Sequence, residues 1–316
     1  MNYRILRIRL LAWFDESHRD LPWRRSHDFY PVWLSEIMLQ QTRVEAVIPY
    51  YERFLALFPD IATLAGAPEH DVLALWSGLG YYSRARNLHR AAKRIAEEGL
   101  PATYEAVLAL PGVGVYTAAA IASISFNQPY AALDGNVNRV LSRLTNGSAD
   151  IQGSAQALLH PRRPGDFNQA MMELGALVCV PKIPRCEQCP LEKNCGARLA
   201  GTERELPVRV KKTPARRLAL DLVRFVIDER IFLVRRSEEE RRLAGFWELP
   251  ERHLFPRLRG TLEGAFTHQI VNDRFEVSVW KAPPPAALPE GRWFDRDELG
   301  AIPLTTMARK ALAVQS

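Results

Sequence analysis

The four cysteines of this chain lie close together, and their type and spacing suit a metal site. Cys179, Cys186, Cys189 and Cys195 form the pattern C-x6-C-x2-C-x5-C. Disulfides are usually spread along a chain, so four neighbouring thiols indicate metal binding instead. Four thiolates can close a tetrahedral zinc site or hold an iron–sulfur cluster. Zinc sites usually use two close cysteine pairs and this chain has one, so the spacing favours iron–sulfur, although the common ferredoxin spacings do not match either.

Basic residues surround the cysteines and suggest a contact with phosphates. They are Lys182, Arg185, Lys193 and Arg198. The four thiols imply no open ligand position, so a bound cluster would not need to take part in catalysis. The formal net charge of +6 also favours a polyanionic partner without demanding one.

A glycine turn and a carboxylate follow each other at a fixed distance. The turn Leu110–Gly114 has the sequence LPGVG and lies between two expected helices. Gly112 and Gly114 let the backbone approach an anion, and the N–H groups that open the next helix can bind it. Asp134 comes twenty residues after Gly114. An aspartate before a glycine often only forms a turn, but the apolar neighbours of Asp134 place it at the entry of a helix.

Amphipathic helices must position these residues, because residues 1–200 show helical apolar spacing. The stretch Met1–Phe14 mixes arginine with leucine and isoleucine and predicts an amphipathic helix rather than a signal peptide. Further helices are expected at Val32–Ile48, Asp71–Trp76, Ser83–Glu98, Tyr104–Leu110, Tyr116–Ser125 and Phe167–Val178. Prolines and glycines separate them, Pro49 among them.

The pattern changes from helices to strands after the cysteines. Strands are expected at Leu218–Ile227, Ile231–Arg236 and Phe275–Lys281, and a final helix at Thr306–Val314. The basic stretch Arg209–Arg217 is interpreted as a linker that could follow a phosphate backbone or be only a solvated tether. We therefore expect a helical domain over 1–200, a linker over 201–217 and a small α+β domain over 218–316.

Length and composition are those of a globular protein with two domains. The chain has 316 residues, of which 47% are hydrophobic and 25% charged. No run of about 18 apolar residues exists, so no membrane span is expected. The protein should stay in the compartment where it is made.

The glycine turn, Asp134 and the cysteine pattern together resemble the endonuclease III superfamily of helix-hairpin-helix DNA glycosylases, over about Arg19 to Cys195. Three segments are similar to the MutY branch, which removes adenine from DNA: Trp33–Thr42 (WLSEIMLQQT), Gly78–Leu88 (GLGYYSRARNL) and Phe167–Ala176 (FNQAMMELGA). The resemblance implies a mainly α fold: a helix-hairpin-helix glycosylase domain with an iron–sulfur cluster loop, plus a C-terminal α+β domain of the MutT (Nudix) type. It also implies one [4Fe–4S] cluster on the four cysteines. The segment 147–165 is several residues shorter than usual in that family.

The resemblance implies three catalytic residues. Glu36 would protonate the flipped adenine and later activate water, and its apolar neighbours should raise its pKa. Asp134 would stabilise the cationic sugar, and Tyr116 would assist beside it. Bifunctional members of the superfamily carry a lysine where this chain has Tyr116. A tyrosine cannot form an imine, so strand cleavage is not expected and the enzyme should be monofunctional.

The resemblance also implies residues that bind the substrate. Arg19, Trp23, Arg24 and Gln169 would line the adenine pocket, whereas Gln41 and Tyr81 would fill the gap beside the flipped nucleotide. Four more residues would contact DNA. Gln40 belongs to the MutY-like segment Trp33–Thr42, Asn136 follows Asp134 closely, and Gly112 and Gly114 are the glycines of the hairpin.

The C-terminal domain resembles the family more weakly. Leu243–Pro250 (LAGFWELP) fits a strand and turn of a MutT-like domain, but Glu251–Gly260 (ERHLFPRLRG) lacks the acidic run that binds magnesium in Nudix hydrolases. The domain should therefore bind and not hydrolyse. Phe266, Thr267 and His268 stand where the family reads oxidised guanine, although His268 could equally be an ordinary polar loop residue.

The expected partner is double-stranded DNA with adenine opposite 8-oxoguanine or guanine, bound by a monomer that in a bacterium is cytoplasmic and associated with the nucleoid. Two alternatives stay open. The first is a related glycosylase for thymine or an oxidised pyrimidine, against which the Glu36 segment and the C-terminal domain argue. The second is a non-catalytic iron–sulfur DNA-binding protein, against which the presence of both Glu36 and Asp134 argues.

Overall fold

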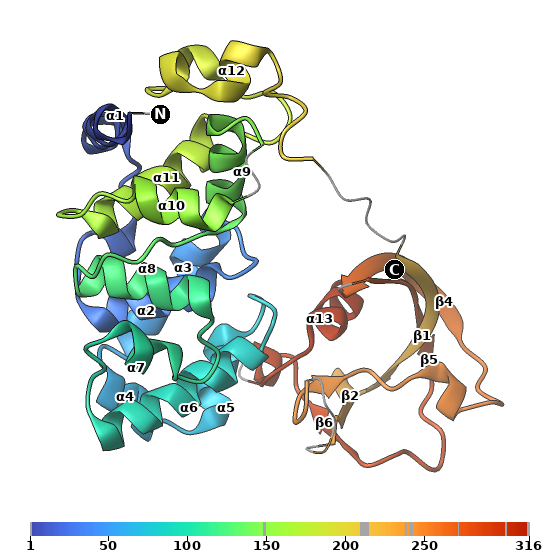
Figure 1. Cartoon of the computed structure of the whole chain (residues 1–316). Coiled ribbons are helices and arrows are strands. Elements are labelled where there is room, and N and C mark those ends of the chain that lie inside the picture. The colour runs from blue at the N-terminus through green and yellow to red at the C-terminus, as the bar shows by residue number, and fades with distance from the viewer. Residues whose placement is uncertain are drawn as a thin grey trace. The chain divides into compact units, whose positions relative to one another are not determined.

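The computed structural model describes residues 2–147, 150–208, 215–237, 239, 243–270, 272–300 and 302–314. The chain forms two compact units (Figure 1). Unit 1 comprises Met1–Ala65 and Arg90–Val210, and unit 2 comprises Gly66–His89 and Lys211–Ser316. Unit 2 thus includes a segment from the middle of the helical region. Most of the expected linker Arg209–Arg217 lies outside the described residues.

Unit 1 is built almost entirely from helices. Its α-helices are α1 (Tyr3–Ser17), α2 (Phe29–Leu39), α3 (Val44–Leu57), α4 (Ile61–Gly66), α7 (Tyr104–Leu108), α8 (Val115–Ser125), α9 (Gly135–Leu144), α10 (Ile151–Leu158), α11 (Pro164–Leu177) and α12 (Gly196–Ala200). Short 3-10 turns are η1 (Pro22–Arg24), η2 (Cys186–Gln188) and η3 (Glu192–Asn194). The helix α6 (Ser83–Glu98) is divided between the units at Arg90, and α5 (Glu69–Trp76) belongs to unit 2.

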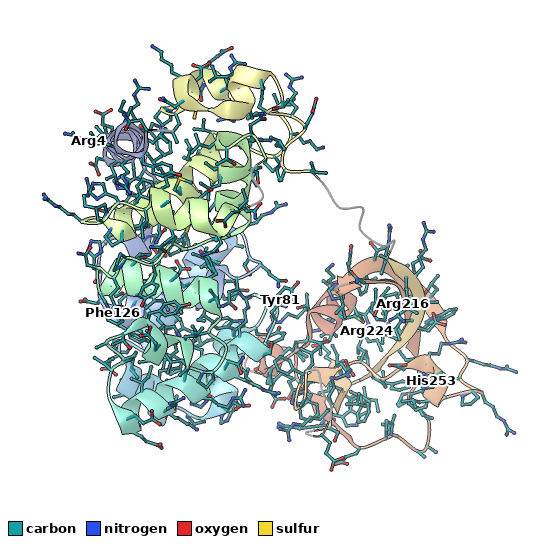
Figure 2. The ribbon with its side chains drawn as sticks, viewed as in Figure 1. Arg4, Tyr81, Phe126, Arg216, Arg224 and His253 are labelled. Atoms are coloured by element: carbon teal, nitrogen blue, oxygen red, sulfur yellow. The ribbon has the colours of Figure 1, made fainter. Side chains whose placement is uncertain are left out.

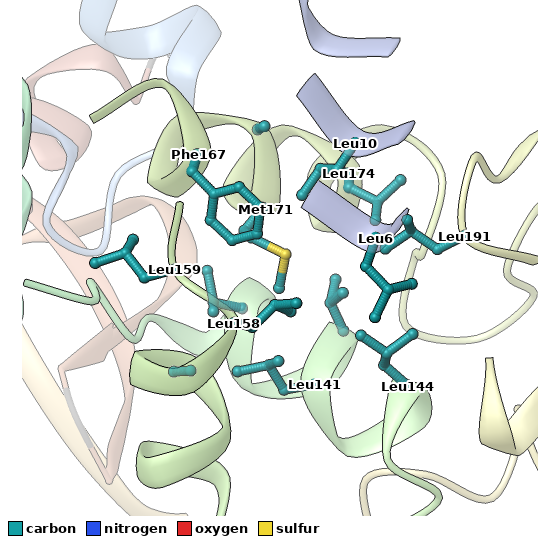
Figure 3. Close-up of a cluster of buried hydrophobic side chains, with 14 of the residues drawn as sticks. Leu6, Leu10, Leu141, Leu144, Leu158, Leu159, Phe167, Met171, Leu174 and Leu191 are labelled. Atoms are coloured by element: carbon teal, nitrogen blue, oxygen red, sulfur yellow. The ribbon is translucent and has the colours of Figure 1, made fainter. Parts of the chain in front are cut away.

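One core of unit 1 joins α1 with α9, α10 and α11. Figure 3 shows its apolar side chains meeting from helices that are far apart in the sequence. The fully buried members include Leu6 and Leu10 from α1, Leu141 from α9 and Leu174 from α11. This packing fixes the start of α9 relative to α11, and both helices carry residues of the proposed site.

The segment expected as one helix, Val32–Ile48, is two helices. Helix α2 ends at Leu39 and α3 begins at Val44, because Gln41 adopts a left-handed backbone (φ 58°) between them. Pro49 was expected to separate helices and instead lies inside α3. A proline there removes one helical hydrogen bond, but Pro49 and Glu45, whose carbonyl loses its partner, are both exposed, so water can replace the bond.

Unit 2 contains a six-stranded sheet. Its strands are β1 (Arg216–Ile227), β2 (Arg230–Arg235), β3 (Trp247–Glu248), β4 (Thr261–Ile270), β5 (Asp273–Ala282) and β6 (Gly291–Phe294). The order is β3-β2-β1-β5-β4, with β6 also paired to β2. Strands β1 and β5 run parallel, and the other pairs are antiparallel. Arg224 of β1, labelled in Figure 2, forms an ion pair with Glu263 of β4 across β5.

Two apolar clusters cover the sheet of unit 2. One joins Leu222, Val277 and Val279 to α13 (Thr306–Ala313), which contributes Ala308 and Ala311. The other contains Val223, Phe225 and Phe232 beneath the turn η4 (Arg252–Leu254) and its neighbours. Alternating strand residues point to opposite faces, which is why neighbours such as Leu222 and Val223 fall in different clusters.

The expected fold class is confirmed: a mainly α region with a C-terminal α+β region. Among the described residues, no helix is both long enough and apolar enough to cross a membrane. The domain boundaries at 200 and 218 and the MutT-like character of the C-terminal domain stay predictions. Of the segment 147–165, residues 148 and 149 lie outside the described part, and α10 forms most of the rest.

Candidate active site and cysteine loop

The structure brings Glu36, Tyr116 and Asp134 together from three helices. Glu36 lies on α2, Tyr116 on the first turn of α8, and Asp134 directly before α9. The Tyr116 hydroxyl group interacts with the Glu36 carboxyl group and also donates to Sδ of Met172 at 3.4 Å. Asp134 acts electrostatically on both Glu36 and Tyr116, so the three side chains belong to one centre.

Burial controls the protonation of Glu36. Its helix α2 is buried on nearly all sides, including Trp33, Ile37 and Met38, and Glu36 is only 7% exposed. Removal of the carboxylate from water raises the pKa of Glu36 to about 7, and the nearby negative charge of Asp134 acts in the same direction. The contact with Tyr116 and the charge of Arg24 oppose this increase. Glu36 can therefore hold a proton near neutral pH and release it there.

This pKa leads to a stability prediction. Because the pKa of Glu36 in the folded state exceeds its usual value of 4.5, the folded protein loses stability as pH rises from about 4.5 to about 7, and the loss is complete above 7. The variant Glu36→Gln lacks the ionisation and should be more stable than the wild type by about 3 kcal/mol at pH 8. At pH 4 the two should nearly agree. Urea unfolding of both proteins at the two pH values measures this, and an equal difference at both would contradict it.

Asp134 begins helix α9 as its N-cap. Its carboxylate accepts a hydrogen bond from the Val137 N–H at 2.6 Å and another from Asn136 Nδ2 at 3.0 Å. These two contacts hold the Asp134 carboxyl group in place at the N-terminus of α9. Asn136 also accepts from Arg139 at 2.8 Å, which fixes its amide.

Arg19, Arg24, Gln169 and Glu173 form one hydrogen-bonded group. The first three were expected to line the adenine pocket. Arg24 donates to Gln169 Oε1 at 3.2 Å, to the Arg19 carbonyl at 3.1 Å and to Glu173 Oε2 at 2.9 Å. Arg19 donates to both oxygens of Glu173 at 2.8 Å. Trp23, the other expected pocket residue, is buried edge-on against Tyr51 with ring centres 5.4 Å apart. The structure thus joins Arg19, Arg24 and Gln169 directly.

The hairpin has the expected helix-turn-helix form. Helix α7 ends before the turn, Gly112 takes a left-handed conformation (φ 78°) and Gly114 is the N-cap of α8. A side chain at Gly112 would be strained in that conformation. Gln40 is tied to α8 by a hydrogen bond of 3.2 Å from its Nε2 to Thr117 Oγ1.

Gln41 and Tyr81, the expected gap-filling residues, share an unusual backbone. Both have positive φ, 58° for Gln41 and 50° for Tyr81, and both side chains are exposed. Non-glycine residues rarely adopt this conformation, and such strain is concentrated at functional sites. Tyr81, labelled in Figure 2, belongs to unit 2, where the Arg84 guanidinium lies 5.5 Å from its ring centre.

The cysteine loop encloses a pocket lined by all four cysteines of the chain. Cys179, Cys186, Cys189 and Cys195 are free thiols and all line one pocket of unit 1. Within the described ranges, no three His, Cys, Asp or Glu side chains are arranged to bind a single metal ion. A zinc ion needs its four ligands about 2.3 Å away, whereas each thiolate of a four-iron cluster can bind a different iron. The four thiols that line this pocket are therefore the residues that could hold a cluster.

Two arginines missing from the sequence-based expectations hold this loop. Arg143 is only 1% exposed and donates to the carbonyl groups of Val180 and Pro181 at 2.8 and 2.9 Å. It also lies 3.2 Å from Cys179 Sγ. Arg139 donates to the Cys179 carbonyl at 2.8 Å. Of the basic residues expected to meet phosphates, Arg198 is already paired with Glu192 and Glu203, whereas Lys182, Arg185 and Lys193 are exposed.

The expected lesion-reading residues lie in a strand and not in a loop. Phe266, Thr267 and His268 are in β4, so Thr267 faces the side opposite to the other two. Phe266 packs on the core beside α13, and Lys310 Nζ lies 5.9 Å from its ring centre. Burial, together with the charge of Lys310, lowers the pKa of His268. His268 is therefore neutral at pH 7 and can both donate and accept a hydrogen bond.

Glu173 is the main site residue that the sequence analysis missed. It occupies the buried face of α11, between the apolar residues Ala170 and Leu174. A lone glutamate in an apolar helical stripe needs a buried cationic partner. That feature was visible in the sequence, but its partners Arg19 and Arg24 are about 150 residues away.

Known proteins resemble this chain in sequence. Residues 34–160 match the model of the "HhH-GPD superfamily base excision DNA repair protein". A human adenine DNA glycosylase is 49% identical over 210 residues, which cover 60% of this chain but only 38% of the human protein. An adenine DNA glycosylase of Buchnera aphidicola subsp. Acyrthosiphon pisum is 35% identical over 268 residues, covering 80% of this chain and 74% of that protein. The chain thus spans well under half the length of its mammalian relatives.

Solved structures agree with this relationship. A thermostable thymine-DNA glycosylase superposes with a TM-score of 0.59 and 27% identity, covering 63% of this chain and 97% of that one. An endonuclease III in a non-covalent DNA complex has a TM-score of 0.54 and 20% identity, which supports the fold alone. The sequence relationship to the Buchnera protein extends over most of both chains. The chain therefore belongs to the HhH-GPD superfamily of base excision DNA repair proteins and, within it, to the family of the adenine DNA glycosylases.

Proposed function

We propose that this protein is a monofunctional glycosylase that removes adenine from DNA where it is paired with 8-oxoguanine or guanine. The observation that carries the proposal is the buried Glu36, whose pKa of about 7 lets it donate a proton, beside Asp134 at the N-terminus of α9. This pair matches the acid and the stabilising carboxylate that hydrolysis of a glycosidic bond requires. The identity to adenine DNA glycosylases supports adenine as the base.

The mechanism follows from the unequal surroundings of the two carboxyl groups. The target nucleotide must leave the base stack to reach a buried acid. Glu36 then protonates the adenine ring, and the bond between adenine and C1′ of the sugar breaks with its electron pair moving to the base. Asp134 stabilises the positive sugar, assisted by the Tyr116 oxygen. Glu36, now ionised, takes a proton from water as the water oxygen bonds to C1′.

The residue types of the site argue against strand cleavage. An amine nucleophile would be needed, and Tyr116 occupies the position after the hairpin where one could act. The lysines in the described part of unit 1 are Lys93, Lys182 and Lys193, and all three are exposed on α6 or the cysteine loop. The buried centre is therefore equipped for hydrolysis alone.

The variant Tyr116→Lys should gain strand-cleaving activity. An amine at this position would lie beside Glu36 and Asp134, where burial lowers the pKa of lysine and leaves part of it as a free nucleophile. Borohydride should then trap a covalent complex with DNA, which the wild type should not form. Val115→Lys, on the exposed neighbour of Tyr116, is the matched control and should trap nothing. Strong trapping by the wild type would overturn the monofunctional assignment.

The four cysteines fit a [4Fe–4S] cluster, which we propose as a structural cofactor. When bound, it would supply a rigid anchor for the loop Cys179–Cys195 and no redox or acid chemistry to base removal. Arg139 and Arg143 hold the loop backbone, and Lys182, Arg185 and Lys193 give it a basic exposed surface. Such a surface suits the phosphates of double-stranded DNA.

The base opposite the adenine needs a second recognition surface. A pocket that holds the flipped adenine cannot also inspect its former partner, so we assign that role to the β4 segment Phe266–His268, in which Phe266 packs on the core and His268 is the hydrogen-bond donor. His268 is half-buried and neutral at pH 7, so it can donate to an acceptor of 8-oxoguanine. Thr267 faces the other way and is the weaker candidate of the three.

Replacing His268 by alanine should reduce the preference for 8-oxoguanine over guanine. Loss of one or two hydrogen bonds costs roughly 1–3 kcal/mol, which means about 5- to 150-fold in the ratio of excision rates. Adenine excision opposite guanine should persist. His253→Ala is the control, because His253 is an exposed histidine of the same unit (Figure 2). An unchanged ratio in His268→Ala would remove His268 from lesion recognition.

Excision assays test the proposed function directly. Duplexes with adenine opposite 8-oxoguanine, adenine opposite guanine, and thymine opposite guanine are incubated with the protein, and abasic sites are revealed with alkali. We expect cleavage after alkali for both adenine duplexes, fastest opposite 8-oxoguanine, and none without alkali. Removal of thymine in place of adenine would instead support the activity named for the thermostable thymine-DNA glycosylase.

A further inference from the structure

Glu173 is a buried carboxylate that the proposed mechanism does not use. It is 1% exposed on α11 and accepts four hydrogen bonds. Three come from Arg19, through its backbone N–H at 3.0 Å and its Nε and Nη2 at 2.8 Å, and one comes from Arg24 Nη2 at 2.9 Å. Burial alone would raise the pKa of Glu173, but the hydrogen bonds from both arginines outweigh it and lower this pKa to about 2.

We propose that Glu173 is a positioning residue for base removal, which holds Arg19 and Arg24 at the adenine pocket and offsets part of their charge beside Glu36. The inference rests on the proposed function, and goes beyond it by assigning a role to a residue that contacts neither base nor sugar.

The geometric part of the inference is the arrangement of Arg24. All three of its guanidinium nitrogens are used within the group: Nη2 by Glu173, Nη1 by the Arg19 carbonyl and Nε by Gln169 Oε1. Since the oxygen of Gln169 accepts from Arg24, the Nε2 group of Gln169 is the part that can donate to a ring nitrogen of adenine. Glu173 thereby sets the orientation of Gln169 through Arg24.

The electrostatic part concerns the charges around Glu36. The groups that face Glu36 are Tyr116 from α8, Asp134 at the start of α9 and Arg24 from η1. The positive Arg24 favours the ionised form of Glu36, and the negative Glu173, bonded to Arg24 at 2.9 Å, reduces that effect. If the charge of Glu173 is removed, Arg24 acts on Glu36 with less compensation, and Glu36 loses its proton at lower pH.

The test is the pH dependence of single-turnover adenine excision by Glu173→Gln. We expect the fall in rate on the alkaline side to move toward acid by about one pH unit, so that the variant is about fivefold slower at pH 7 and nearly normal at pH 5.5. Asp166→Asn is the matched control, since it breaks another arginine–carboxylate pair on α11, at Arg163, and should leave the profile unchanged. In the double variant Glu173→Gln with Arg24→Gln, the pH at which the excision rate falls should return toward the wild-type value, although the overall activity is lower.

Three outcomes would overturn the inference. The first is a folded Glu173→Gln protein with a wild-type profile, and the second is a double variant whose profile matches that of Glu173→Gln. If Glu173→Gln does not fold, the variant Glu173→Asp replaces it in the test, because aspartate keeps the negative charge on a shorter side chain. The pH profile of excision by Glu173→Asp should match that of the wild type, whereas its affinity for a duplex with 2′-fluoro-2′-deoxyadenosine should fall. The third outcome is a Glu173→Asp protein whose pH profile and DNA affinity both equal those of the wild type. A wild type that removes no adenine would instead refute the proposed function.

Discussion

The variant Glu36→Gln should lose adenine excision and keep DNA binding. Glutamine preserves the shape of the side chain but cannot donate a proton, and the loss of a general acid typically lowers a rate by 10²–10⁴. Because Glu36 is also proposed as the base toward water, the effect should reach at least the upper end of that range. The affinity for DNA should change little, since the basic surface of the cysteine loop is untouched. Single-turnover excision and a binding titration on the adenine:8-oxoguanine duplex measure the two quantities.

A matched control makes this result specific. Glu52 is an exposed residue of α3 in the same unit, and Glu52→Gln removes the same charge without touching the site. It should excise adenine at the wild-type rate. Turnover by Glu36→Gln close to that of Glu52→Gln would exclude Glu36 as the proton donor and leave the mechanism without an acid.

Mutation of a single cysteine should unfold the loop Cys179–Cys195. The purified wild type should be brown and contain iron, and Cys186→Ser and Cys189→Ser should both lose colour, iron and DNA binding to a similar extent. Metal binding to cysteines is coupled to folding and is worth on the order of 10 kcal/mol for structural sites, which exceeds the stability of most domains. Iron content, visible absorbance and thermal unfolding are the measurements.

Gln188 offers a control for the cysteine variants. Gln188 is exposed and lies between the two cysteines, so Gln188→Ser changes the loop without removing a ligand and should remain brown. A colourless wild-type protein with one zinc ion per chain would show that the four cysteines bind zinc and not an iron–sulfur cluster. We expect iron, because the four cysteines include one close pair and not the two that are usual in zinc sites.

The composition of unit 2 changes how its role should be tested. Ser77 and Tyr82 come from the middle of the chain but bond to its C-terminal part: Arg309 donates to Ser77 Oγ at 3.0 Å, and the Tyr82 hydroxyl donates to the Leu304 carbonyl at 3.1 Å. The Tyr82 ring also packs on Phe246 at 4.1 Å. Deletion of residues 218–316 would expose these groups beside Tyr81, so a loss of lesion preference after deletion has two possible causes. The point variant at His268 separates them.

The sequence by itself determined the features that depend on local order. The pattern of apolar residues predicted helix Ser83–Glu98 with the bounds that the structure has, since amphipathic periodicity depends only on neighbours three and four residues apart. The apolar neighbours of Asp134 placed it at the entry of a helix, and it is the N-cap of α9. The apolar neighbours of Glu36 likewise predicted its raised pKa. For the helix and the N-cap the decisive atoms belong to residues close in the chain, whereas the burial of Glu36 also depends on how α2 packs against the other helices.

Only the tertiary structure decided the contacts between distant segments. The Arg19–Glu173 pair joins residues 154 positions apart, and no local pattern states which of 35 possible arginines meets a buried glutamate. Strand β4 was missed because its residues alternate only weakly, and it forms by pairing with β5. The break between α2 and α3 depends on the left-handed Gln41, a conformation that packing must maintain against its intrinsic cost. Such contacts form because folding buries many groups at once, so the identity of each partner is a property of the whole chain.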